Sequence, residues 1–126
     1  STLNENLIRN LAAKLAKMDN TVIIVSSNLL HYGPLYNFAP FKYNIKTEFE
    51  NLSNRILDAL LNVNPENLFS IINKYNFYLI SPLLVLLEVL KIKKIEKGKI
   101  LSNELVQKDE KNFISIASIT YNEVKN

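Results

Sequence analysis

The side chains in this sequence that could do chemistry gather in residues 21–34. A β-branched apolar run is followed by two serines and an asparagine, and His31, the only histidine of the chain, comes soon after. A neutral imidazole can bind a metal ion or exchange a proton near neutral pH, and a serine hydroxyl can donate a hydrogen bond to an anion or a carbonyl group. We therefore take His31 as the candidate metal ligand, and Ser26 and Ser27 as candidate substrate-binding residues.

Each of these residues also has a purely structural interpretation. Serines that end a strand often bond only to nearby backbone groups, and a single histidine can simply hydrogen-bond the loop that it begins. A serine nucleophile is not favoured, because the chain has two glycines and no Gly-x-Ser-x-Gly elbow. A metal site needs about three protein ligands, whereas the chain has one histidine and no cysteine. Another polypeptide, or a second copy, would have to supply the remaining ligands.

The spacing of apolar residues predicts the elements that position this segment. Thr47 and Glu50 form a capping-box signature, and Asn64 and Ser81 each precede a proline at the start of a helix. The last of these helices is apolar nearly all round, so we expect it to be the central buried one. The predicted helices cover residues 3–17, 47–62, 65–75 and 82–93, and the predicted strands cover residues 22–26, 99–106 and 113–121.

These elements predict one α/β domain over residues 1–126. The first strand is apolar on both faces, which is typical of a parallel strand covered on two sides. We therefore expect a short, mostly parallel sheet flanked by helices, with a carboxyl-terminal antiparallel hairpin. His31 would then lie at the carboxyl end of a parallel strand, where open α/β sheets bind their ligands. Residues 32–46 are predicted to form a long, packed, aromatic-rich loop.

The segment Ser26-Ser27-Asn28-Leu29-Leu30-His31-Tyr32-Gly33 resembles the Ser-Ser-Asp-x-x-His-(Trp/Tyr)-Gly signature of the Memo-like family. That family is related by fold to the class III extradiol dioxygenases, which use a non-haem metal. The order of the downstream elements is similar too, and the resemblance covers nearly all of this chain but only the carboxyl-terminal half, or less, of a typical member. It implies that His31 faces a metal such as iron, copper or zinc, and it extends the candidate substrate-binding residues to Asn28 and Tyr32.

The sequence departs from the family's pattern at its site. Asn28 replaces the motif aspartate, the family's other site histidines lie in the amino-terminal half, and its late cysteine has no counterpart near residues 101–113. The resemblance therefore favours a Memo-like protein with an incomplete site, acting as a non-catalytic interaction or scaffold subunit that pairs with a complementary chain or with its own copy. The alternative is a subunit of a non-haem metal-dependent enzyme, with redox or hydrolytic chemistry and His31 as one ligand.

The composition of the chain limits the kinds of site, cellular location and partner that we expect. The chain has 126 residues, a formal net charge of +3 and no cysteine, which excludes disulfides and thiolate metal sites within it. No apolar run is long enough for a membrane span and no secretory signal is visible, so we expect a cytoplasmic protein without a membrane partner. The lysines of residues 91–99 alternate with isoleucines and accompany no nucleic-acid motif, so we expect a solvated surface rather than a nucleic-acid site.

Overall fold

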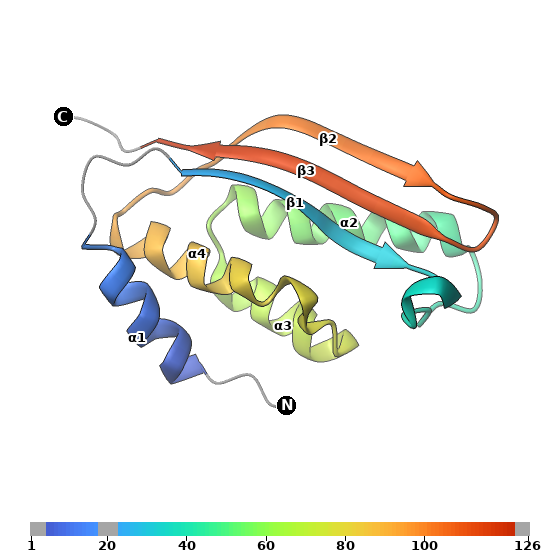
Figure 1. The fold of residues 1–126 in the computed structure, drawn as a ribbon, viewed down its shortest axis with the longest axis horizontal. Helices are drawn as coiled ribbons and strands as arrows, with labels where there is room; N and C mark the ends of the chain where they lie inside the picture. Colours follow the sequence, from blue (N-terminus) through green and yellow to red (C-terminus); the bar gives the residue numbers. More distant parts are fainter. Residues whose placement is uncertain (1–4, 18–22, 123–126) are drawn as a thin grey trace.

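The computed structural model describes residues 5–17 and 23–122, which form a three-stranded sheet backed by helices (Figure 1). All four described helices lie on one side of the sheet, and α1 packs against α4 as an outer element. The elements are α1 (Glu5–Leu15), β1 (Ile23–Tyr32), the 3₁₀ turn η1 (Pro34–Tyr36), α2 (Ile45–Leu61), α3 (Pro65–Tyr75), the 3₁₀ turn η2 (Tyr78–Ile80), α4 (Pro82–Ile92), β2 (Lys99–Gln107) and β3 (Phe113–Tyr121).

The described sheet is antiparallel throughout, so the prediction of a mostly parallel sheet is wrong. Its strand order is β1-β3-β2, and β3 pairs antiparallel with both neighbours. The apolar run at the start of β1 predicts burial, but it does not report the direction of the neighbouring strand, which here is the antiparallel β3. The carboxyl-terminal hairpin, β2 and β3, is confirmed.

The first strand is longer than the sequence indicated. It continues through the two serines to Tyr32, with a bulge between Asn28 and Leu30. The backbone of this strand pairs with β3 from Ile23 as far as Tyr32. The bulge inserts one extra residue, so Leu29 and Leu30 are both buried.

The core lies between the sheet and the helices. Leu84, Leu87 and Leu90 of α4 are buried in it, and α1 covers the other side of α4, which confirms the predicted central position of this helix. Burying an aliphatic side chain of this size contributes about 1.5–3 kcal/mol. The Tyr121 hydroxyl donates a buried hydrogen bond to the Leu60 carbonyl over 2.6 Å, which fastens β3 to the end of α2.

Helix starts follow the sequence signals only in part. The Asn64 side chain accepts a bond of 3.0 Å from the Asn67 backbone N–H and caps α3 as predicted. The predicted capping box is wrong, because α2 begins at Ile45 after Asn44 with a φ of 50° and has no side-chain cap. No helix within the described ranges is long and apolar enough to cross a membrane.

Candidate functional site

His31 lies near the end of β1, on the face of the sheet that the described helices leave uncovered. Its flanking residues Leu30 and Tyr32 are buried in the core, and successive side chains of a strand point to opposite faces. We call this uncovered side the open face, and the register places on it Asn28, His31, Ile114, Ile116 and Ser118. His31 stays near the carboxyl end of its strand, although the strand is antiparallel.

The imidazole of His31 is half-buried and has an unsatisfied nitrogen. Its ring meets the edge of the Tyr36 ring at 4.8 Å between centroids and 71° between planes. The Nε2 atom is buried and has no hydrogen-bond partner in the described part of the chain. Buried polar atoms are nearly always paired, so this nitrogen requires an explanation.

The described part of the open face is apolar at the His31 end and mixes apolar with polar residues farther along the strands. One row of cross-strand neighbours joins His31, Ile114 and Val106, one residue from each strand. Ile114 is 8% exposed although it faces away from the helices, so this end of the open face is already partly closed. The row that follows is Asn28, Ile116 and Glu104, and the Ser118–Ser102 pair lies beyond it.

The structure places the other candidate residues differently. Tyr32 is 1% exposed and points into the core, where its hydroxyl donates to the Phe41 carbonyl over 3.2 Å and accepts from the Phe41 N–H over 3.1 Å. Its ring stacks on Phe41 at 5.5 Å and 9°, which packs the predicted aromatic loop against β1. The backbone of Ser26 pairs with Ser118 and that of Ser27 with Ala117, and the side chains of these two serines lie outside the described part of the structure.

The segment after His31 is clamped by the β2–β3 turn. The buried Asn112 side chain accepts a bond of 3.1 Å from the Leu35 N–H and donates to both carboxylate oxygens of Asp109 over 2.8 and 2.9 Å. Hydrogen bonds from the Lys111 backbone and from Asn112 hold the pKa of Asp109 below its ordinary value. The sequence predicts this turn only as a hairpin connection and does not reveal that it clamps the segment after His31. The signal in the sequence is Gly33, because only glycine readily adopts the φ of 126° that the clamped segment requires.

The donor set of the described residues does not fit a metal ion on its own. No group of three His, Cys, Asp or Glu side chains in the described ranges is placed to hold one. His31 therefore contributes at most one of the roughly three protein ligands that a metal site needs. The expectation from the sequence that a second polypeptide must complete any such site is consistent with this arrangement and stays a prediction.

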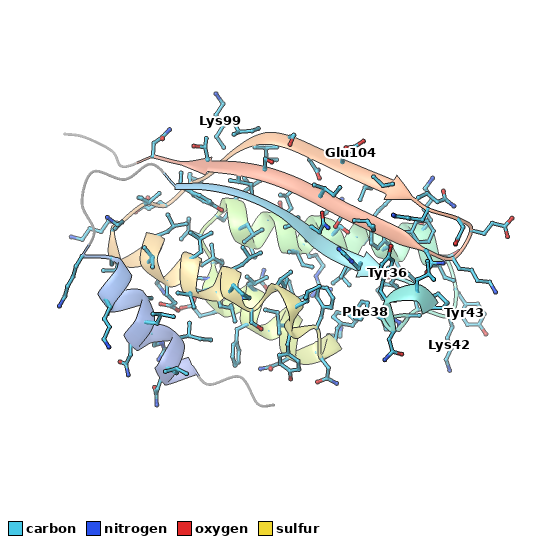
Figure 2. All side chains as sticks on the ribbon, viewed as in Figure 1. Tyr36, Phe38, Lys42, Tyr43, Lys99 and Glu104 are labelled. Carbon is cyan, nitrogen blue, oxygen red and sulfur yellow. The ribbon has the colours of Figure 1, made fainter. Side chains whose placement is uncertain are left out.

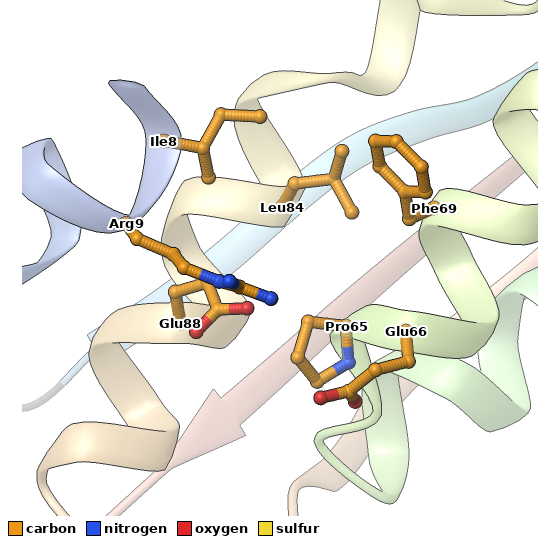
Figure 3. Close-up of a pocket in the computed structure, with 7 residues that line it drawn as sticks. All are labelled: Ile8, Arg9, Pro65, Glu66, Phe69, Leu84 and Glu88. Carbon is orange, nitrogen blue, oxygen red and sulfur yellow. The ribbon is translucent and has the colours of Figure 1, made fainter. Parts of the chain in front are cut away.

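A small crevice between α1, α3 and α4 lies away from β1 (Figure 3). Its volume is about 30 Å³, which is room for little more than a water molecule. Nearby, Lys91 Nζ and Glu66 Oε1 form an ion pair at 2.6 Å. The hydrogen bond between them lowers the pKa of Glu66 and raises that of Lys91. None of the residues lining this crevice belongs to the motif segment, so it is not part of the candidate site.

Comparisons with known proteins agree with the motif. Neither the curated proteins nor the solved structures gave a match to the chain. A family model described as "Memo-like protein" matches residues 2–120, which is nearly the whole sequence and includes the segment around His31. The chain therefore belongs to the Memo-like family.

Proposed function

We propose that this protein is a non-catalytic interaction subunit whose open face docks a polypeptide carrying the complementary half of a Memo-like unit. The observation that carries the proposal is the buried, unpartnered Nε2 of His31 on a sheet face free of described helices. A docked chain that offers one hydrogen-bonding group there would satisfy this nitrogen. No group of three metal-binding side chains is found in the described residues, so a catalytic metal site would need more groups from the partner than docking does.

The apolar end of the open face supports a protein partner. An antiparallel sheet with one solvated face normally carries polar residues on that face. Here the central strand instead presents Ile114 and Ile116, with Val106 beside Ile114 on β2. Buried interface centres are apolar with a polar rim, and Ser102, Ser118 and Glu104 would form such a rim.

Binding of a purified amino-terminal half of a Memo-like protein, measured by isothermal titration calorimetry, tests the proposal. The variant Ile116→Lys should weaken binding by about a hundredfold or more, because it places an unpaired charge inside the contact. Leu79→Lys is the matched control, since Leu79 is 65% exposed on η2 and lies outside the open face. His31→Ala should cost about tenfold or less, the value of one hydrogen bond. Unchanged binding of the Ile116 variant would contradict the proposal.

The same nitrogen also favours a second candidate function. His31 would then be one ligand of a non-haem metal, with the remaining ligands supplied by the docked polypeptide. In that case the complex should contain iron, copper or zinc in a fixed ratio to protein, and His31→Ala should remove the metal without separating the subunits. Metal analysis of the purified complex and of its His31→Ala form decides between the two functions.

A further inference from the structure

Strand β2 is an edge strand whose residues are mostly exposed, although α2 contacts part of it. It pairs only with β3, and eight of its nine residues are exposed while Val106 is half-buried. Three aliphatic side chains lie in this exposed stretch, with exposed fractions of 39% for Ile100, 55% for Leu101 and 44% for Leu105. Leu101 is the extra residue of the bulge between Ile100 and Ser102 and has no partner on β3. An exposed apolar edge without proline is a template for another strand.

The charges of β2 are arranged so that the strand complements itself. Lys99 is paired with Thr120 and Glu104 with Ile116, so both lie on the open face. Figure 2 shows both side chains above β2, on the side away from the helices. Neither forms an ion pair within the described ranges. If a second copy runs antiparallel along this edge, each lysine faces the other copy's glutamate when the two-fold axis passes between Leu101 and Ser102.

We propose that two copies of this chain pair through β2 and form a continuous six-stranded antiparallel sheet. The pairing register sets Lys99 opposite Glu104 twice, and opposite charges across strands are favourable whereas like charges are not. It also brings the two Leu101 side chains together at the axis, where both lose water. The two-fold axis is perpendicular to the sheet, so the two open faces lie on the same side of the dimer and stay free for the proposed partner.

The register fixes distances that cross-linking can test, because the chain has no natural cysteine. Strands rise about 3.3 Å per residue and lie about 4.8 Å apart. The two Ser102 positions should therefore be about 6 Å apart between Cα atoms, which is within the range that a disulfide bridges. The two Gln107 positions should be about 36 Å apart by the same rise per residue. Ser102→Cys should form a disulfide dimer under mild oxidation, and Gln107→Cys, equally exposed, should not.

The second test exchanges the charges of Lys99 and Glu104 and measures the mass of each variant in solution by sedimentation velocity. The unaltered chain should reach twice its 14.5 kDa as concentration rises. Glu104→Lys should raise the dimer dissociation constant about tenfold or more, because two attractive pairs become repulsive. The double variant Lys99→Glu, Glu104→Lys should restore dimerisation, and Glu110→Lys in the exposed turn should leave it unchanged. A chain that stays monomeric, a cross-link at residue 107 rather than 102, or a double variant as weak as the single one would overturn the proposal.

Discussion

Replacement of Gly33 by alanine is expected to be among the most damaging single-methyl changes in this protein. Gly33 has a φ of 126° and a ψ of 174°, a conformation that is essentially restricted to glycine. A side chain there also meets its neighbours, because an added Cβ would lie 2.1 Å from Asn112 Oδ1 and 2.6 Å from the Lys111 carbonyl oxygen. Gly33→Ala therefore carries a conformational cost and a steric cost together.

The two costs can be estimated separately. Holding a non-glycine residue in this backbone region costs about 1–3 kcal/mol. Moving the Asn112 side chain away breaks its bond with the Leu35 N–H, and a lost hydrogen bond of this kind costs about 1–3 kcal/mol. We expect the free energy of unfolding to fall by about 2–6 kcal/mol in total, with a central value of about 4 kcal/mol. With a urea m-value of about 2 kcal/mol/M, the unfolding midpoint should fall by roughly 2 M.

Urea denaturation of four chains tests this reasoning: the unaltered protein, Gly33→Ala, Asn112→Ala and the double variant. If the Asn112 side chain is the main obstacle, the two changes should be non-additive by about 1 kcal/mol or more, with Gly33→Ala less damaging when Asn112 is already alanine. A Gly33→Ala protein within about 0.5 kcal/mol of the unaltered one would refute the argument, as that is the size of an ordinary surface change.

Three further predictions concern single interactions. Tyr121→Phe should lower the free energy of unfolding by about 1–3 kcal/mol, measured by urea denaturation, because it removes the buried donor to the Leu60 carbonyl. The lowered pKa of Asp109 means that its clamp stabilises the fold fully above the ordinary carboxyl value of 3.8 and is lost as pH falls from there through the lower folded value. Asp109→Asn should flatten this acid limb in denaturation curves taken from neutrality down to below the folded value. Glu66→Gln should cost no more than about 1 kcal/mol, and added salt should shrink the difference in thermal melts, because the ion pair with Lys91 is largely exposed.

The helices and the hairpin could be predicted because their signals are local. Asn64 followed by proline predicts a helix start whatever surrounds it, and the structure begins α3 at Pro65. The apolar run of residues 83–90 predicts a buried helix, and two strands joined by a charged turn predict a hairpin. The direction of the strands could not be predicted in this way. It depends on β1 pairing with β3 about 90 residues away, and nothing in residues 22–26 encodes that neighbour.

The candidate site was predictable only at one point. His31 could be identified from the motif and from its residue type, since no other histidine competes with it. The residues around His31 could not be identified from the sequence, because Ile114 and Val106 lie beside it through strand pairing and not through proximity in the chain. The position of Tyr32 illustrates the same limit: it is adjacent to His31 in the chain, yet the alternation of the strand sends it into the core.

Dimerisation through the β2 edge and binding of the half-chain on the open face can be tested separately. Pairing through β2 leaves each open face accessible, so a dimer should bind two complementary half-chains, one above each His31. Glu104 lies in both regions, because it belongs to the open-face row of Ile116 and to the β2 edge. The charge-exchanged double variant should therefore recover dimerisation but bind the half-chain differently from the unaltered protein, whereas Ile116→Lys should lose the half-chain and remain a dimer. Loss of both properties in the Ile116 variant would mean that one surface, not two, holds the assembly together.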